Sequence, residues 1–319
     1  MTQNSELRTH HTHVLIIDEI HPSIFSMLES IGIKADYRPD IKPVDVCEAL
    51  AGFDGLIIRS KMRVTADTLK HADKLKFVAR AGAGVDNIDA DALEAKGIAL
   101  FGANEGNRQA VGEFALGLLI SLTRNTARGD RQVRDKIWLR EENRGDEISG
   151  KTVGIIGYGN MGQSFAKVLS GFGCRIIAYD RYAPEKIGAP AINVTLEQLQ
   201  QEADIVSLHI PYIKDNLGFA SDAFFSSFAK PIWFLNTSRG DVVDQQALVK
   251  HLKSGNIKGA ALDVLENEKL KTLTEIQQIS FDYLAQADNV ILTPHIAGWT
   301  HESYIKINEV LVAKIKDIL

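Results

Sequence analysis

Short apolar runs alternate with helical stretches along most of the chain. In its first third, runs suited to buried strands occur at 13–18, 55–60, 75–82 and 97–102, with a helical stretch around 24–30. Buried strands separated by helices are typical of a parallel sheet that helices cover on both faces. The pattern therefore predicts a first α/β unit in this part of the chain.

The same alternation returns in the second half of the chain. Strands are predicted at 153–156, 175–179, 204–211, 232–238, 259–265 and 289–294, with a helix at 244–254. Six strands are the number in a full dinucleotide-binding sheet. The sequence thus predicts an α/β protein with two doubly wound parallel-sheet domains.

The longest apolar helical pattern, 104–125, joins the two predicted domains. Glu113 interrupts it, and its apolar part, 111–122, is too short to span a bilayer, so we expect a buried or interface helix. The charged stretch 124–147, which contains Trp138, follows as an excursion. An arm of this kind often meets a second subunit, so a homodimer is expected.

A glycine turn lies within 152–180, TVGIIGYGNMGQSFAKVLSGFGCRIIAYD, between a predicted strand and helix. Gly157, Gly159 and Gly162 follow the order G-x-G-x-x-G. The first glycine permits a tight turn, the second lets a pyrophosphate approach, and the third lets the helix pack closely on the strand. Free N–H groups and the helix dipole would hold the phosphates.

Asp180 ends the strand that follows the glycine turn. A carboxylate at this place can accept both ribose hydroxyls of adenosine and repels the 2′-phosphate of NADP. We therefore expect NAD as the cofactor, although the neighbouring Arg181 could attract a phosphate.

Composition and charge exclude other classes of protein. The chain has 319 residues, 45% hydrophobic and 24% charged, which is ordinary for a globular protein. A net charge of −5 and a pI near 6.0 argue against nucleic-acid and membrane partners. No apolar run reaches the length of a membrane span, and the N-terminus lacks the apolar segment of a signal peptide.

Cysteines and histidines give no sign of a metal site. Cys47 and Cys174 lie far apart without redox or metal spacing, as expected for reduced residues of a cytoplasmic protein. His10, His11 and His13 lie close together in a polar N-terminal stretch, which we interpret as a solvated tail.

Candidate chemistry follows from the strand ends, because ligands of such sheets bind outside the carboxyl ends of their strands. The polar residues at these places are His209, Thr237, Ser238, Arg239, Asp263 and His295. In the first domain, small residues at 81–84 follow a predicted strand. Their backbone N–H groups are expected to be free to form an anion nest.

Together these segments resemble the D-isomer-specific 2-hydroxyacid dehydrogenase family. The matching segments, in order, are RAGAGVDNID (80–89), the glycine turn, HIP (209–211), SRGDVVD (238–244), GAALDV (259–264) and TPHIAG (293–298). The resemblance implies a discontinuous, flavodoxin-like substrate domain of residues 1–103 and 299–319. It also implies a Rossmann NAD-binding domain of residues 104–298.

The resemblance implies hydride transfer between NAD and a D-2-hydroxy or 2-keto acid. Arg239 matches the substrate arginine, whose planar fork can hold a carboxylate and polarise a carbonyl. His295 matches the acid/base, and Glu268 matches its carboxylate partner. Lys269 departs from the family, which usually has proline there, and the loop 270–288 is longer than usual. The conformation of this loop is therefore left open.

The resemblance also implies the binding residues. Those expected at the cofactor are Gly157, Gly159, Asn160, Met161, Gly162, Asp180, His209 and Pro211 on the adenosine side, Thr237, Asp263 at the nicotinamide carboxamide, and Gly298. Those expected at the substrate are Arg59, Ser60, Arg80, Gly82, Ala83, Gly84 and Arg140.

The cations Arg59, Lys61, Arg63, Arg80 and Arg140 resemble the phosphoglycerate dehydrogenase branch, in which arginines hold the substrate phosphate. The expected reaction therefore interconverts 3-phosphoglycerate and 3-phosphohydroxypyruvate, as in serine biosynthesis. The alternatives are reduction of an unphosphorylated 2-keto acid (glyoxylate, hydroxypyruvate or pyruvate) and NAD sensing by a corepressor-type binding protein. A solvated basic edge without a ligand also remains open.

Two further expectations concern neighbouring enzyme types. Tyr182 to Lys186 forms the Y-x-x-x-K spacing of short-chain dehydrogenases, but Pro184 argues against a continuous helix there. The helical segment 302–319 leaves no room for the serine-sensing domain of some phosphoglycerate dehydrogenases, so we expect no serine feedback.

Overall fold

The computed structural model describes residues 12–318; His10 and His11 lie outside this range. The chain forms two compact units, Met1–Asn107 with Thr300–Leu319 and Arg108–Trp299. We call them the first and the second unit. The sequence placed the corresponding boundaries at 103/104 and 298/299.

The first unit contains a five-stranded parallel sheet with the order β2-β1-β3-β4-β5. Its elements are β1 (His13–Ile16), α1 (Ser23–Ser30), β2 (Lys34–Tyr37), α2 (Pro43–Ala49), η1 (Leu50–Gly52), β3 (Gly55–Ile58), β4 (Phe77–Arg80), α3 (Ala90–Glu94), β5 (Ala99–Gly102) and α11 (His301–Lys316). This strand order is the flavodoxin-like one, as predicted. The sequence missed β2, because this edge strand is not buried and lacks an apolar run.

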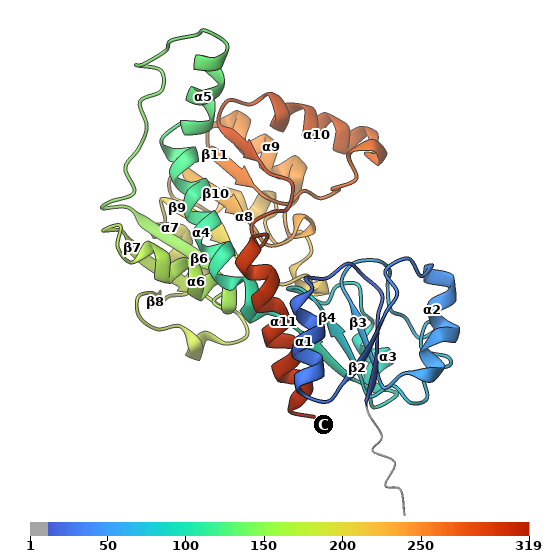
Figure 1. The fold of residues 1–319 in the computed structure, drawn as a ribbon. Coiled ribbons are helices and arrows are strands. Elements are labelled where there is room, and N and C mark those ends of the chain that lie inside the picture. Colours follow the sequence, from blue (N-terminus) through green and yellow to red (C-terminus); the bar gives the residue numbers. More distant parts are fainter. Residues whose placement is uncertain (1–11, 319) are drawn as a thin grey trace, which may run out of the picture. The chain divides into compact units, whose positions relative to one another are not determined.

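Helices cover both faces of this sheet, and separate apolar clusters lie beneath them. Helix α11, from the far end of the chain, lies beside α1 (Figure 1). Leu311 and Ile315 of α11 are fully buried in the same cluster as Leu28 of α1. The C-terminal helix therefore completes the core of the first unit.

The second unit contains a seven-stranded parallel sheet with the order β12-β11-β10-β9-β6-β7-β8. Its strands are β6 (Thr152–Ile156), β7 (Arg175–Tyr179), β8 (Ile192–Asn193), β9 (Ile205–Leu208), β10 (Ile232–Asn236), β11 (Ile257–Leu262) and β12 (Val290–Leu292). The prediction of six strands was wrong. The additional strand, β8, has only two residues, both exposed, so no apolar run marks it.

The helices of the second unit are α4 (Asn104–Thr123), which begins in the first unit, α5 (Thr126–Arg134), α6 (Asn160–Leu169), α7 (Leu196–Glu202), α8 (Asp222–Ser226), α9 (Gln245–Ser254) and α10 (Glu275–Gln286). Short 3-10 helices are η2 (Pro184–Lys186), η3 (Lys214–Asn216), η4 (Gly240–Val242) and η5 (Leu270–Thr272). The segment left open by the sequence, 270–288, thus folds into η5 and α10.

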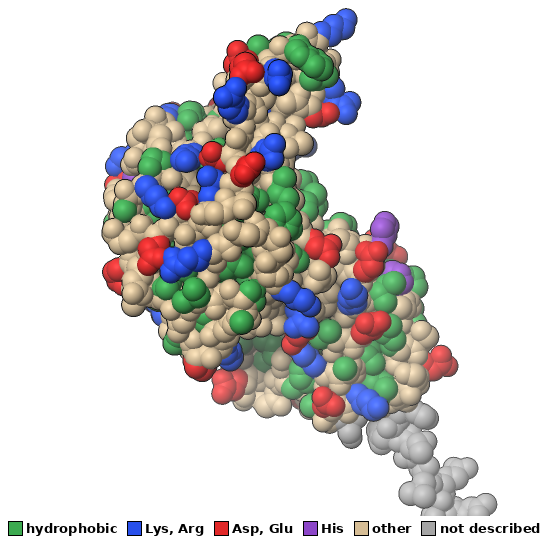
Figure 2. All heavy atoms as spheres, turned by 90° about the vertical axis from the view of Figure 1, so that its left-hand side faces the viewer, with side chains coloured by type: hydrophobic (Ala, Val, Ile, Leu, Met, Phe, Trp, Pro, Cys, Tyr) green, Lys and Arg blue, Asp and Glu red, His purple; other side chains and the backbone are tan. Residues whose placement is uncertain are grey.

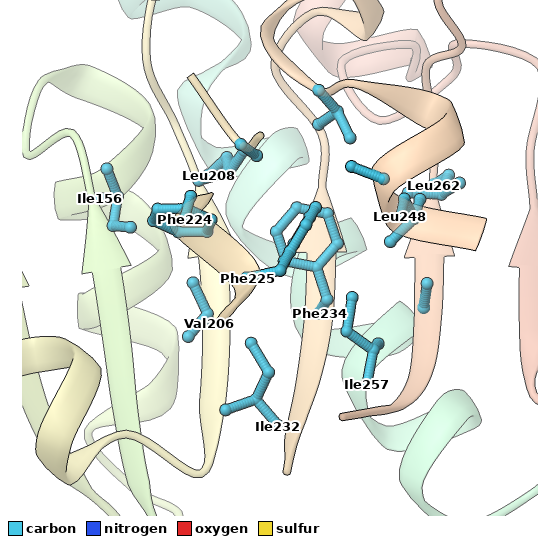
Figure 3. Close-up of a cluster of buried hydrophobic side chains, with 14 of the residues drawn as sticks. Ile156, Val206, Leu208, Phe224, Phe225, Ile232, Phe234, Leu248, Ile257 and Leu262 are labelled. Atoms are coloured by element: carbon cyan, nitrogen blue, oxygen red, sulfur yellow. The ribbon is translucent and has the colours of Figure 1, made fainter. Parts of the chain in front are cut away.

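Aliphatic and aromatic side chains pack together on one face of this sheet (Figure 3). Phe225 of α8 meets Phe234 of β10 edge to face, with ring centroids 5.2 Å apart. Leu248 of α9 is fully buried in the same cluster. Burying a side chain of this size contributes about 2 kcal/mol, so this layer holds the strands whose ends carry the candidate site.

The charged stretch after α4 forms an arm, α5 with residues 135–147, that projects from the rest of the second unit (Figure 1). Figure 2 shows cations and anions interspersed over this arm, with a few hydrophobic side chains between them. The indole of Trp138 is 81% exposed, and Val133, Ile137 and Leu139 are also exposed. Within residues 12–318, no helix has the length and apolarity needed to cross a membrane.

Candidate active site

At two positions of the glycine turn, the surrounding backbone leaves no room for a Cβ. Gly157 has φ +90°, and a Cβ there would lie 2.6 Å from the carbonyl oxygen of His209. A Cβ on Gly162 would collide with the carbonyl oxygen of Gly157. The turn and the start of α6, with Asn160 and Met161 in its first turn, therefore pack closely on β6 and β9.

Asp180 follows β7 and is tied to the glycine turn. Its Oδ2 accepts a hydrogen bond from the Tyr158 N–H at 2.7 Å, and its Oδ1 accepts from Tyr182 and Ala183 N–H, both at 2.9 Å. Burial opposes ionisation, but these N–H donors outweigh it and hold the pKa of the carboxyl below its usual value. Asp180 is thus a fixed anion, and its oxygens retain lone pairs for further donors.

His209 lies inside the second unit, 9% exposed. Its Nε2 lies 2.9 Å from Ser207 Oγ, and its ring is 5.3 Å from that of Phe165. Burial lowers the pKa of His209 to about 3, so the ring is neutral. The ring therefore packs against Phe165 of α6, the helix that follows the glycine turn. The carbonyl of the next candidate, Pro211, accepts from Asn216 Nδ2 at 3.0 Å.

The structure brings His295 and Glu268 together. His295 Nδ1 lies 2.9 Å from Glu268 Oε1 and 3.1 Å from Oε2, and both side chains are about half exposed. With Nδ1 donating to the carboxylate, Nε2 is the nitrogen left for proton exchange with a substrate. Such a pair has the geometry of a general acid/base with an orienting partner.

The backbone of His295 is left-handed, with φ +56°, which is costly for a residue with a Cβ. Asp263, buried after β11, holds this turn. Its Oδ1 accepts from Thr293 Oγ1 at 2.6 Å and Ile296 N–H at 2.9 Å, and its Oδ2 accepts from Ala297 N–H at 2.8 Å. The carboxylate of Asp263 thus supports the turn that carries His295, and the nicotinamide contact expected for Asp263 stays a prediction.

Arg239 follows β10, the neighbour of β11 in the sheet. Its guanidinium donates to Ser238 O at 2.7 Å, and its carbonyl accepts from Asn236 Nδ2 at 2.9 Å. Asn236 Oδ1 also accepts from the N–H and hydroxyl of Ser238. Sequence reasoning missed Asn236, although an asparagine at a strand end before a turn is a usable signal.

Two further features lie at this sheet edge. A Cβ on Gly240 would collide with Leu265 O, so the loops after β10 and β11 pack directly on one another. Thr237 Oγ1 is buried and has no hydrogen-bond partner in the described part of the chain. A buried hydroxyl left this way fits a polar group of a bound cofactor. Gly298, the last predicted cofactor residue, lies in the turn before α11.

In the first unit, the predicted substrate residues surround the ends of β3 and β4. Asp18 Oδ2 accepts from Arg59 N–H at 2.6 Å, which fixes the loop that also carries Ser60. Arg80 donates from Nε to Arg59 O at 3.2 Å and from its terminal nitrogen to Ala83 O at 2.5 Å. The Arg59 guanidinium lies 5.6 Å from the ring centre of Tyr304.

The expectation of free N–H groups at 81–84 was wrong for Ala81, Gly82 and Gly84. Ala81 N–H donates to Ile58 O, Gly82 N–H to Arg80 O, and Gly84 N–H to Asn104 Oδ1. Pairing with β3 uses the Ala81 donor, a tight local turn uses that of Gly82, and a side chain from α4 uses that of Gly84. Arg140 belongs to the second unit, in which it lies in an exposed turn of the arm.

Among residues 12–318, no group of three His, Cys, Asp or Glu side chains is placed to hold a metal ion. Cys47 and Cys174 are both free thiols.

Comparison with known proteins agrees with this geometry. Residues 116–297 match the family model of the D-isomer specific 2-hydroxyacid dehydrogenase NAD-binding domain. The D-3-phosphoglycerate dehydrogenase of Methanocaldococcus jannaschii is 33% identical over 96% of this chain, and the chain spans 57% of that protein. The hydroxypyruvate reductase of Thermotoga maritima is 36% identical over 82% of this chain and 83% of its own length.

A solved structure, the TT0316 protein from Thermus thermophilus, superimposes with a TM-score of 0.80 at 29% identity and covers 94% of both chains. The family model alone covers more than half of the chain and includes every residue from the glycine turn to His295. The chain therefore belongs to the D-isomer-specific 2-hydroxyacid dehydrogenase family.

Proposed function

We propose that this protein is an NAD-dependent dehydrogenase that interconverts 3-phosphoglycerate and 3-phosphohydroxypyruvate. The observation that carries its dehydrogenase activity is the His295–Glu268 pair, 2.9 Å apart. The pair lies on the same sheet edge as Arg239, because β12, β11 and β10 are consecutive parallel strands.

The second unit would bind the cofactor and the first unit the substrate. The turn from Gly157 to Gly162, the start of α6 and Asp180 are suited to the pyrophosphate and adenosine ribose. The buried Thr237 hydroxyl is suited to the nicotinamide side. Bound NAD supplies or accepts the hydride.

The chain's own residues handle the proton and the charge. In the oxidation direction, Nε2 of His295 takes the hydroxyl proton of the 2-hydroxy acid. The hydride on C2 of the acid leaves to the bound NAD, so atoms and charge balance. Glu268 holds the ring and stabilises the resulting imidazolium. In the reverse direction His295 returns the proton to the carbonyl oxygen, which Arg239 polarises while it holds the carboxylate.

The phosphate assignment rests on cations at the ends of β3 and β4. Arg59 and Arg80 are linked there through the Arg59 carbonyl, and Lys61 Nζ donates to Pro39 O and Ile41 O. The name of the M. jannaschii relative supports a phosphorylated substrate. The name of the T. maritima relative supports the alternative, an unphosphorylated 2-keto acid such as hydroxypyruvate.

The test is to follow NADH oxidation with 3-phosphohydroxypyruvate, hydroxypyruvate, glyoxylate and pyruvate in parallel. We expect the highest kcat/KM with the phosphorylated acid. Arg59→Met should lower that value about tenfold and leave hydroxypyruvate turnover nearly unchanged, because only the phosphate loses a cation. Preference for an unphosphorylated acid would overturn the phosphate assignment. Tight NADH binding without turnover of any acid would instead favour an NAD-sensing binding protein.

We also propose that the arm contacts a second copy of this chain, since Val133, Ile137, Trp138 and Leu139 expose apolar surface on it. A homodimer in the cytoplasm is the expected form. Sedimentation equilibrium of the intact chain tests the dimer.

A further inference from the structure

Glu268 lies at the apex of an Asx turn. The side-chain Oδ1 of Asn267 accepts a hydrogen bond from the Lys269 N–H at 3.0 Å, so the turn closes around Glu268. Lys269 has an N–H to donate, whereas a proline at this position would have none, so the turn depends on this hydrogen bond.

The other end of the same amide reaches α10. Asn267 Nδ2 donates to Gln277 Oε1 at 3.2 Å and to Thr272 O at 3.3 Å. Gln277 is in turn fixed by the capping box of α10, in which its N–H donates to Thr274 Oγ1 and its Oε1 accepts from Thr274 N–H. Its Nε2 donates to Glu266 Oε1 at 3.4 Å. Gln277 thus contacts both residues that precede Glu268.

Helix α10, which carries Gln277, is anchored by its packing on the rest of the second unit. Leu284 is 1% exposed and belongs to the main apolar cluster of the second unit. Tyr283 packs under Lys253 of α9, whose Nζ lies 4.8 Å from the ring centre. A side chain anchored on this helix can therefore hold the loop before it.

We propose that Asn267 and Gln277 are positioning residues that direct the Glu268 carboxylate at His295. Glu268 is about half exposed, and a glutamate in a loose loop would spread over rotamers in which it does not reach the imidazole. A restrained turn reduces the conformational entropy that Glu268 would otherwise lose on pairing with His295, and it does so before the substrate binds. This inference rests on the proposed roles of Glu268 and His295.

The test compares Asn267→Ala, Asn267→Asp and Gln277→Met with Gln278→Met as the matched control. Gln278 is the next residue on α10, and its Nε2 donates to Asp282 Oδ1 on the same helix, away from the loop. We expect Asn267→Ala and Gln277→Met to lower kcat about tenfold, with KM and NADH affinity nearly unchanged. Gln277→Met also removes the side-chain bond of the α10 capping box, so its Tm should fall slightly. Asn267→Asp keeps the acceptor for Lys269 N–H and should recover part of the loss.

A double-mutant cycle with Glu268→Gln separates positioning from a general structural effect. Since Gln277 acts through Glu268, Gln277→Met should lower kcat little further in the Glu268→Gln background. A kcat for Gln277→Met equal to that of Gln278→Met would overturn the inference, as would parallel losses of kcat, NADH affinity and Tm. If Glu268→Gln itself keeps the wild-type kcat, the proposed role of Glu268 fails, and the inference fails with it.

Discussion

Asp263 Oδ2 accepts a hydrogen bond from the Ala297 N–H at 2.8 Å, across the turn that carries His295. The second oxygen accepts from Thr293 Oγ1 and from Ile296 N–H. A carboxylate can accept on both sides, whereas an asparagine at this buried position would direct its own NH2 group at one of the donors. The charge of Asp263 is therefore needed for the shape of the turn.

We predict that Asp263→Asn lowers the free energy of unfolding by about 2 to 3 kcal/mol, because a buried donor loses its acceptor. Turnover should fall as well, since the left-handed backbone of His295 loses its support. Urea unfolding and initial rates measure the two effects. Asp282→Asn is the control, because Asp282 is an exposed carboxylate with a bond from Gln278; it should change stability by less than about 0.5 kcal/mol. Equal effects of the two substitutions would contradict the role of Asp263.

Hydrophobic patterning predicted every strand of the two sheets except β2 and β8, each at one edge of its sheet; β5 and β12, at the opposite edges, were predicted from their apolar runs. Neither β2 nor β8 contains a fully buried residue, so neither has the apolar run that marks a buried strand. Such strands are held by backbone hydrogen bonds to a neighbouring strand, and the pattern of side chains does not predict those bonds.

In the candidate site too, the sequence predicted some residues and missed others. His295 and Glu268 were found because residues at strand ends follow a family pattern, and the structure places them in contact. Asn267 and Gln277 were missed because their hydrogen bond joins residues ten positions apart through the fold of an unusual loop. The free N–H groups expected at 81–84 were wrong for a related reason, since Asn104 reaches Gly84 from another element.

Asp180 should set the choice between NADH and NADPH. Its three N–H donors keep it ionised, and a charged carboxylate repels the 2′-phosphate of NADPH. Asp180→Asn keeps an acceptor for the backbone but removes the charge, so the preference for NADH should fall by about tenfold or more. Fluorescence titration with both nucleotides measures the ratio of dissociation constants. Asp204→Asn is the control, because Asp204 precedes β9 and pairs with Lys230 at the opposite end of the strands. An unchanged ratio in Asp180→Asn would contradict this role.

His209 should make the fold sensitive to acid. Burial lowers its pKa to about 3 in the folded protein, whereas an unfolded histidine titrates near pH 6.5. Between these values the unfolded chain binds the extra proton, so the stability present above about pH 6.5 is lost progressively as the pH falls toward 3. At about pH 5 the loss from this residue is about 2 kcal/mol.

The measurement is urea unfolding of wild type and His209→Gln between neutral pH and about pH 5, within the range over which an unfolded histidine becomes charged. The glutamine cannot take up a proton, so the stability of His209→Gln should fall less with acid than that of the wild type. His71→Gln, at an exposed histidine, should follow the wild-type curve. Acid also protonates carboxylates such as Asp180, but that contribution is common to all three proteins and cancels in the differences. Parallel curves for His209→Gln and wild type would contradict this prediction, because they would mean that the buried ring accepts a proton in the folded protein without loss of stability.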